Sequence, residues 1–364
     1  MFMFSSLSAQ EVALPPAPIV EQMPNFPKKK LVNKTVSSSN KLSRNEVVQL
    51  WNNEYMNSEE VPINWTGERN NCSAGIVAGE FREATLRRIN FYRTMAGLPG
   101  VTFSDDFNAK SQQAALMMIA KGWLSHQPGG DWPCYTPGGA EAAGKSNLAL
   151  GACGPEAIDH YMEDHGDHNA AVGHRRWLLF PPQEVMGTGS TNASNNGFSG
   201  SDALWIIGGW GERPANTDFV AWPPRGFVPY QIVWGRWSFS YPDADFSQAS
   251  VTMNIEGAGS PPIDLEPVKE KRGDNTIVWK PAYWLPSSET PQEDVDVQVH
   301  VENVLISGQP MSFEYTVTII DPSRPGGGVE KRVVAEALLE PQPAGELDIN
   351  SDGVIDAADL YLAQ

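Results

Sequence analysis

The spacing of apolar residues changes near Trp222, and this change limits the possible folds more than any other feature of the chain. Before it, apolar residues recur at three- and four-residue intervals in the segments 82–96 and 105–121, which is typical of amphipathic helices. After it come short alternating runs bounded by turn residues, which predict an all-β, Ig-like sandwich over 222–322. We therefore predict an α+β protein in which a helix-containing domain precedes a β-sandwich domain.

The domain boundaries follow from the same pattern. The helix-containing domain is expected over 44–215, with its core at 80–212, and the apolar runs at 186–190 and 204–210 predict two buried strands in it. The strands predicted for the sandwich are 230–234, 236–240, 251–255, 276–279, 295–301 and 313–320. Residues 323–346, which include two prolines near the end, are expected to be a linker.

Cap residues predict where several helices begin. Ser43 followed by Glu46 is a capping-box signature for the first helix. Ser104 precedes two acidic residues, so it is expected to cap the helix that follows. Pro155 suits the first position of a further helix.

The first 43 residues are expected to lie outside the folded domains. Residues 1–10 resemble the end of a secretory signal, with a short apolar stretch before small residues but no basic beginning. Residues 10–43 are rich in Pro, Ser and Lys, which predicts a disordered leader. We expect export, so the protein is predicted to be secreted, periplasmic or at the cell surface.

The net charge of −18 over 364 residues excludes some classes of partner. Nucleic-acid binding needs a basic surface, and an acidic protein is also poorly suited to docking on anionic lipid. A membrane span needs roughly 18 consecutive apolar residues, and we find no such stretch in the sequence. We therefore predict no nucleic-acid partner and no membrane span.

The three cysteines, Cys72, Cys134 and Cys153, allow one disulfide and one free thiol. Three pairings are possible, and the sequence alone does not choose between them. None of the cysteines belongs to a CxxC pair, so a structural zinc site built from cysteines is not expected.

Residues 348–359 have the pattern of a calcium-binding loop, with Gly353 at the sixth position where such loops turn sharply. The predicted Ca²⁺ ligands are the side chains of Asp348, Asn350, Asp352, Asp356 and Asp359 and the carbonyl of Val354. The stretch 347–364 resembles the first repeat of a type I dockerin, a module that normally has two repeats. The resemblance implies a cohesin-like partner for a complete module and a place in polysaccharide degradation.

Five of the six histidines lie between His126 and His174, and histidine is suited both to proton transfer near neutral pH and to metal binding. The other three in this window, His160, His165 and His168, are interpreted as loop or surface residues, because Gly166 is expected to interrupt the helix between them.

Several motifs in order resemble the CAP (SCP/TAPS) superfamily, in particular its bacterial members with a Gly-His-Arg run. The motifs are Arg88-Ile-Asn-Phe-Tyr-Arg93, Gly97-Leu-Pro99, Leu124-Ser-His126, Lys145-Ser-Asn147 and Gly173-His174-Arg175-Arg176. They extend over about 80–190. The resemblance implies an α-β-α sandwich.

The resemblance also implies a cleft that holds two histidines and two acids. His126 and His174 match the histidines, but Ser146, next to Asn147, stands where the family has a glutamate. The second acid is expected to be Glu163 or Asp164. The groove is predicted to be lined by Ser146, Asn147, Glu141 and Asp164, with Glu141 as a possible substitute for the missing acid.

The leading prediction is a secreted protein that binds a lipid, peptide or glycan in this groove. One alternative is an extracellular hydrolase of peptides or cell-wall polymers, with His126, His174 and Glu163 as catalytic residues. His126 and His174 are also the candidate ligands of Zn²⁺ or another divalent ion. A second alternative is an accessory protein of polysaccharide breakdown, in which Trp237 and Trp279 on the sandwich hold carbohydrate.

Overall fold

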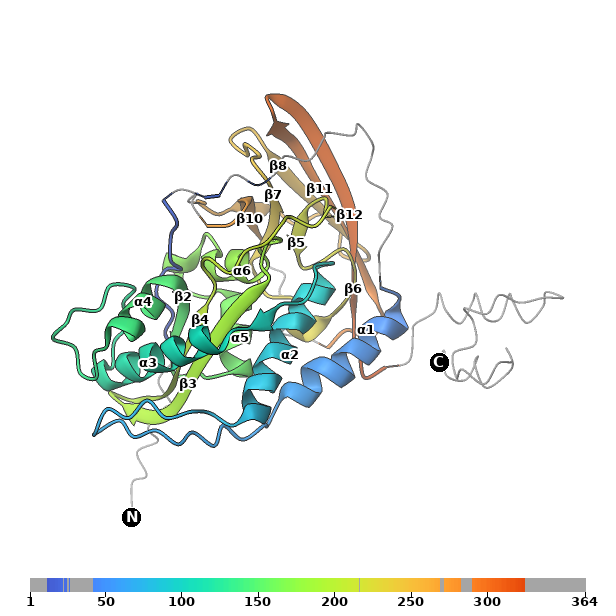
Figure 1. Ribbon diagram of the computed structural model, residues 1–364. Coiled ribbons are helices and arrows are strands. Elements are labelled where there is room, and N and C mark those ends of the chain that lie inside the picture. Colours follow the sequence, from blue (N-terminus) through green and yellow to red (C-terminus); the bar gives the residue numbers. More distant parts are fainter. Residues whose placement is uncertain are drawn as a thin grey trace, which may run out of the picture.

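The computed structural model describes residues 12–21, 23–24, 26, 42–215, 217–268, 272–282 and 290–324 (Figure 1). The calcium loop predicted at 348–359 lies outside them, as do residues 1–11 and 325–346 of the predicted leader and linker. Within the described part of the chain, no helix has the length and apolar character needed to cross a membrane.

Three helices of the N-terminal half begin where their cap residues predict. The Ser43 hydroxyl accepts from the Glu46 N–H, and the Glu46 carboxylate accepts from the Ser43 N–H, so the capping box is confirmed. Ser104 caps α3 and Pro155 begins α5, also as predicted. The helices are α1 (Arg44–Leu50), continued by a π-helical turn (Trp51–Tyr55) and a 3-10 turn (Met56–Ser58), α2 (Gly79–Met95), α3 (Asp105–Lys121), α4 (Pro137–Lys145), α5 (Pro155–Glu163) and α6 (Gly173–Leu178).

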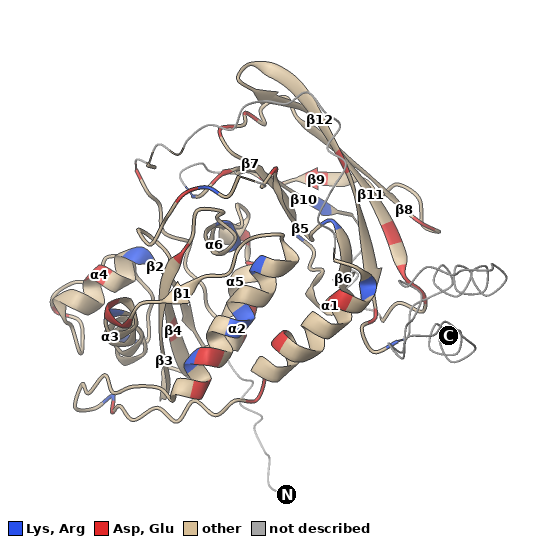
Figure 2. Cartoon of the chain, turned by 45° about the vertical axis from the view of Figure 1, so that its right-hand side comes forward, with Lys and Arg blue, Asp and Glu red and all other residues tan. Residues whose placement is uncertain are grey.

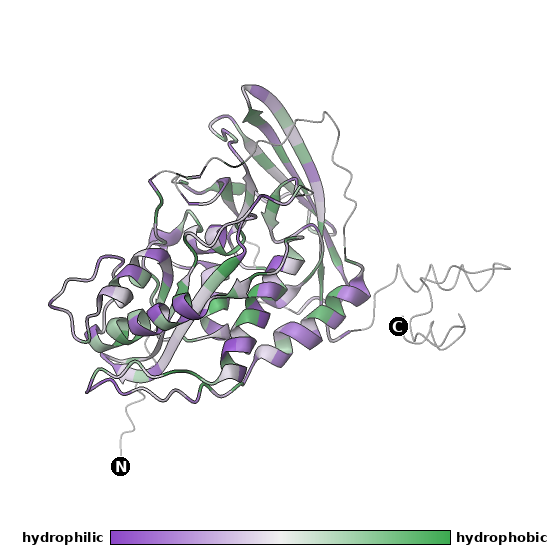
Figure 3. Cartoon of the chain, in the orientation of Figure 1, coloured by the Kyte–Doolittle hydropathy of each residue, from purple (hydrophilic) through white to green (hydrophobic). Residues whose placement is uncertain are grey.

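A four-stranded sheet of order β1-β3-β4-β2 separates these helices into two groups. Its strands are β1 (Thr102–Phe103), β2 (Ser146–Leu150), β3 (Val185–Asn195) and β4 (Phe198–Trp205). Leu148 and Trp205 pack with α3 and α4 on one face, whereas Ala149 and Leu204 pack with α2, α5 and α6 on the other. The hydropathy of the elements is shown in Figure 3. The order of layers is therefore α-β-α, as the CAP resemblance implies.

The C-terminal half is a pair of facing four-stranded sheets, of order β5-β7-β10-β9 and β6-β12-β11-β8. The strands are β5 (Val220–Trp222), β6 (Gly226–Pro229), β7 (Trp237–Tyr241), β8 (Ser250–Ile255), β9 (Ile263–Leu265), β10 (Asn275–Pro281), β11 (Val295–Ile306) and β12 (Gln309–Ile320). Phe239 of β7 meets Phe313 of β12 across the two sheets, with ring centroids 5.0 Å apart. This is a sandwich built mainly of antiparallel strands.

Two differences between the predicted and the observed strands matter here. Residues 230–234 form no strand, because the chain turns into a 3-10 helix, Tyr230–Ile232, directly after β6. β2 was not predicted, because all five of its residues are buried and the run therefore shows no alternation. This omission matters because Ser146 and Asn147 lie on β2.

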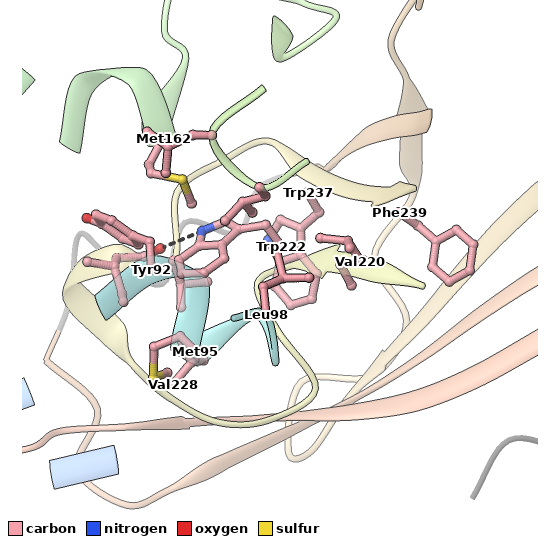
Figure 4. Close-up of a cluster of buried hydrophobic side chains, with 14 of the residues drawn as sticks. Tyr92, Met95, Leu98, Met162, Val220, Trp222, Val228, Trp237 and Phe239 are labelled. Atoms are coloured by element: carbon pink, nitrogen blue, oxygen red, sulfur yellow. Dashed lines mark hydrogen bonds between the residues drawn. The ribbon is translucent and has the colours of Figure 1, made fainter. Parts of the chain in front are cut away.

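One apolar cluster continues from the helices into the sandwich (Figure 4). Tyr92 and Met95 of α2 pack beside Trp222 of β5 and Val228 of β6. The Tyr92 and Trp222 ring centroids are 5.3 Å apart in an edge-to-face arrangement. The two halves therefore share a core.

A disulfide joins Cys72 to Cys134, and Cys153 is the free thiol. This selects one of the three pairings that the sequence left open. Cys72 and Cys134 both lie in loops, outside the helices and strands of the domain.

Candidate functional site

His174 and Asp164 form the buried centre of the site. The His174 Nδ1–H donates to Asp164 Oδ1 at 2.7 Å, and the His174 backbone N–H donates to Asp164 Oδ2 at 2.8 Å. Asp164 terminates α5 in the left-handed conformation, with φ 58°, which turns its side chain toward the start of α6. Of the two acids considered for this position, Asp164 is therefore the one that contacts His174.

The rest of the His174 ring lies inside the protein. It stacks on Tyr161 with ring centroids 5.5 Å apart, and its Nε2 is buried with no hydrogen-bond partner among the described residues. Asn147 donates from Nδ2 to the His174 carbonyl at 3.2 Å. Ser146 is fully buried next to Asn147, and its hydroxyl also has no partner among the described residues.

His126 has both ring nitrogens against backbone carbonyls. Nδ1 lies 2.8 Å from the Ala143 oxygen and Nε2 lies 2.9 Å from the Pro16 oxygen. A neutral imidazole carries one N–H, so only the protonated ring donates to both. Burial lowers the pKa of His126, and the two hydrogen bonds act in the opposite direction. In this arrangement neither nitrogen of His126 is free to bind a metal or to take a proton from a substrate.

The carbonyl opposite His126 belongs to an extended segment, residues 12–20, which we call the strap. The strap lies beside β2 (Figure 1), where Ala13 and Leu150 exchange two backbone hydrogen bonds of 2.9 and 3.1 Å. Residues 12–21 thus have a defined place, which differs from the disordered leader predicted over 10–43.

Two further histidines hold the strap. His165 Nε2 lies 2.8 Å from the Val12 oxygen, and His168 Nε2 lies 2.7 Å from the Leu14 oxygen. A carbonyl only accepts, so each nitrogen carries the proton. Together with His126, whose Nε2 lies 2.9 Å from the Pro16 oxygen, three imidazoles therefore face every second carbonyl of the strap from Val12 to Pro16. His165 lies in a loop and His168 is exposed, as predicted, and both also contact the strap, which was not predicted.

The far end of the strap is held by donors from both halves of the protein. Trp177 of α6 donates from Nε1 to the Pro18 oxygen at 2.8 Å. Arg272, which precedes β10, donates from Nε to the Ala17 oxygen at 2.9 Å. The strap therefore lies in a groove formed by the helical half on one side and by Arg272 on the other.

His160, Glu163 and His165 form a separate cluster at the end of α5. One ligand atom of each lies within 4.8 Å of the others. The Nδ1 atoms of both histidines are buried without a hydrogen-bond partner among the described residues. Burial, and secondarily the neighbouring His165, lowers the pKa of His160, which favours a neutral ring. Two imidazoles and a carboxylate are a donor set that suits Zn²⁺.

A buried carboxyl group, Asp202 of β4, lies behind Tyr161. It accepts from the Tyr161 hydroxyl at 3.1 Å and from the Ser190 hydroxyl at 2.7 Å. Burial raises its pKa to about 7, although these hydrogen bonds act to lower it. Asp202 was not selected from the sequence, because it is one acid within a run of small residues.

Glu141 is engaged away from His174. Its carboxylate pairs with Lys145 at 2.9 Å and with Lys110 at 3.2 Å, and its side chain is 41% exposed. Acidic and basic residues are seen together along α2 as well (Figure 2). Glu141 is thus part of a surface ion-pair network, and the structure gives no contact that would make it the missing acid of the groove.

The arginines of the predicted motifs support the fold. Arg88 pairs with Asp159 of α5 and lies over the Tyr55 ring, 3.6 Å from its centroid. Arg93 donates to the carbonyls of Leu178, the last residue of α6, and of Phe180 and Gln183 beyond it. Arg175 donates to the Arg236 carbonyl at 2.8 Å in the sandwich half. Burial lowers the pKa of Arg175 to about 10.

The sandwich tryptophans do not form a binding surface. Trp237 and Trp279 are fully buried between the sheets, with ring centroids 6.4 Å apart. Neither can stack on a sugar, so these residues give no support to the prediction of carbohydrate binding by the sandwich.

The comparisons with known proteins agree with the helical half. A search of curated proteins finds no match to the chain. Residues 86–207 match the family model described as the Cysteine-rich secretory protein family, CAP. The match spans α2 to the end of β4, and so includes His126, Ser146, Asp164 and His174. Residues 86–207 of this chain are therefore similar to a CAP domain.

Proposed function

We propose that this protein is an extracellular CAP-domain protein whose groove binds an extended peptide and does not cleave it. The observation that carries this proposal is the row of imidazoles, His165, His168 and His126, whose Nε2 atoms lie within hydrogen-bond distance of alternate carbonyls of the strap. Carbonyls repeat in this way along any extended polypeptide. Lipids have no repeating row of acceptors, and glycan hydroxyls donate as well as accept, whereas the strap carbonyls only accept. Peptide is therefore the favoured class among the three ligands considered.

The positions of His126 and His174, which match the two histidines of the CAP family, favour binding over turnover. His174 is fully buried and pairs with Asp164, which suits a structural role. Both ring nitrogens of His126 lie within hydrogen-bond distance of backbone carbonyl oxygens. A general base needs a free nitrogen within reach of the proton that it takes, and neither ring offers one to a bound peptide.

Two further observations support an extracellular location. The Cys72–Cys134 disulfide suits an oxidising compartment, and CAP proteins are commonly extracellular. The proposed calcium loop at Asp348–Asp359 fits the same location. Separately, we propose a cohesin-like partner on the basis of the dockerin-like repeat.

The proposed function is tested by offering the full chain three probes at millimolar ligand concentration. The probes are a random peptide library, sterol-containing phosphatidylcholine vesicles, and insoluble polysaccharide. We expect retention of peptides, recovered intact by mass spectrometry, and loss of retention when His126, His165 and His168 are all replaced by Ala. Retention of vesicles or polysaccharide without peptides, or recovery of cleaved peptides, would contradict the proposal.

Metal binding is a second candidate function, and it is favoured at His160, Glu163 and His165 over the pair His126 and His174. Ligands of a tetrahedral zinc with bonds near 2 Å lie about 3.3 Å apart, so the three side chains need only a small inward movement from their present spacing. Calorimetry with Zn²⁺ should show one binding event that His160→Ala removes and His300→Ala keeps. Loss of the event with His174→Ala alone would return the metal to the originally predicted pair.

The calcium loop is tested in the same way. Calorimetry with Ca²⁺ on the full chain should show an event that Asp352→Ala abolishes, because this side chain is a predicted ligand. An unchanged isotherm would reject the loop.

A further inference from the structure

The hydrogen bonds that hold the strap are made mainly by its acceptors. Beyond the Ala13 pairing with β2, its polar contacts with the described residues run from side-chain N–H groups to strap carbonyls. These carbonyls, of Val12, Leu14, Pro16, Ala17 and Pro18, face His165, His168, His126, Arg272 and Trp177 respectively. The groove is thus a row of donors.

The sequence of the strap matches this one-sided bonding. Pro15, Pro16 and Pro18 have no backbone N–H, so this part of the chain consists of acceptors with few donors to satisfy. Pro18 is buried, and another residue there would bury an N–H group that needs its own partner. Proline also holds the chain extended before binding, which lowers the entropy lost on docking.

The strap has both buried anchor side chains and exposed side chains. Leu14 and Ala17 are 5% and 4% exposed, whereas Ile19 is 49% exposed. Ala17 faces Gly173, where an added Cβ would lie 2.8 Å from the Ala17 Cβ. The groove therefore accepts a large apolar residue and, three positions later, only a small one.

We propose that the strap is an intramolecular ligand, and that the groove binds a proline-rich, apolar extended peptide of another protein when the strap is displaced. This inference rests on the proposed peptide-binding function and adds the ligand class and its regulation. A tethered segment competes at an effective concentration in the millimolar range. The intact chain is thus self-inhibited, and a partner must outcompete the strap or act where the strap is released.

The test uses the full chain and an acetylated, amidated peptide with the sequence of residues 12–20. Leu14→Asp in the protein places a charge at a buried anchor of the strap and leaves the groove itself unchanged. We expect this variant to bind the labelled peptide at least tenfold more tightly than the wild-type chain does, by fluorescence anisotropy. Ile19→Asp is the matched control, because it changes an exposed strap residue and should bind as the wild type does.

A second variant guards against a folding defect in the first. Ala17→Leu is apolar and loses its place only because Gly173 leaves no room for the larger side chain. It should also bind the peptide at least tenfold more tightly than the wild type. If both variants fail to fold by circular dichroism, the strap belongs to the obligatory core and the inference is rejected.

The outcomes separate this inference from the proposed function. If the opened variants bind random peptides as well as the strap peptide, the proline-rich class is rejected while peptide binding stands. Equal peptide affinity of the wild type and both opened variants rejects self-inhibition alone. If the opened variants bind no peptide at all, both proposals are rejected.

Discussion

The imidazole of His168 donates to the carbonyl of Leu14 at 2.7 Å, across a separation of 154 residues. The contact depends on a turn at Gly166, whose φ of +86° lies in the region that favours glycine. This turn lets His165 and His168 both face the strap although they lie outside a continuous helix. The N-terminal segment and the loop after α5 therefore form one binding unit.

Replacing His168 by Ala should loosen the strap. One hydrogen bond contributes about 1 kcal/mol, so exchange of the Ala13 and Leu150 amides, which pair the strap with β2, should become roughly fivefold faster. Hydrogen–deuterium exchange with mass spectrometry measures this. His300→Ala, in the distant strand β11, should leave both amides unchanged, and unchanged exchange in His168→Ala would show that the contact does not hold the strap.

Replacing Asp164 by Asn should destabilise the whole protein. The Asp164 carboxylate accepts from the ring and the backbone of His174 and from the Arg175 N–H, all in the buried interior. Loss of one member of such a buried charged network costs about 3 kcal/mol, measurable as a fall in the free energy of unfolding in urea. Glu163→Gln is the control, since the Glu163 side chain is 39% exposed and should change stability by less than about 0.5 kcal/mol. If the two substitutions lower the free energy of unfolding equally, the buried hydrogen bonds of Asp164 do not stabilise the fold as we predict.

The sequence predicted the helices better than the site. Periodicity and caps are local, so Ser43, Ser104 and Pro155 located the starts of α1, α3 and α5. The strap was not predicted because backbone carbonyls make its hydrogen bonds to the groove side chains, and backbone carbonyls are the same for every residue type. Proline-rich composition is typical of disorder when no partner is known, and here the partners are donors more than a hundred residues away.

The sequence did identify the two histidines of the resemblance, but not what each one contacts. His174 was linked to an acid at 163 or 164, and only the left-handed end of α5 decides between them. His126 was expected to share a site with His174, whereas its ring nitrogens meet the Ala143 and Pro16 carbonyls. Such choices depend on loop dihedral angles and on distant segments, which hydrophobic patterns do not encode.

Cys153 should be nearly inert in the folded protein. Burial, with Asp202 and Glu156 nearby, raises the pKa of its thiol to about 12, so little thiolate exists at pH 8. We expect Ellman's reagent to react with it roughly a thousandfold more slowly than with free cysteine. In denaturant without reductant, a single thiol should react, because Cys72 and Cys134 are paired. Rapid reaction of the native protein, or reaction of three thiols in denaturant, would contradict these assignments.

Asp202 should make the stability of the protein depend on pH between about 4 and 7. Its pKa is raised from 3.8 when unfolded to about 7 when folded, so the folded state binds more protons than the unfolded state in this window. Stability contributed by this group is therefore present at low pH and is lost as pH rises toward 7, by at most about 1.4 kcal/mol per pH unit.

Asp202→Asn removes the titrating group and keeps the size of the side chain. The unfolding free energies of both proteins are measured in urea from pH 4 to 8. As the pH rises, the wild type should lose stability relative to the variant, and this change should level off above pH 7. Glu302→Gln, at an exposed position of β11, should give a difference that does not change with pH in this way. A flat difference for Asp202→Asn would mean that the carboxyl is ionised in the fold and that Tyr161 and Ser190 fully stabilise its charge.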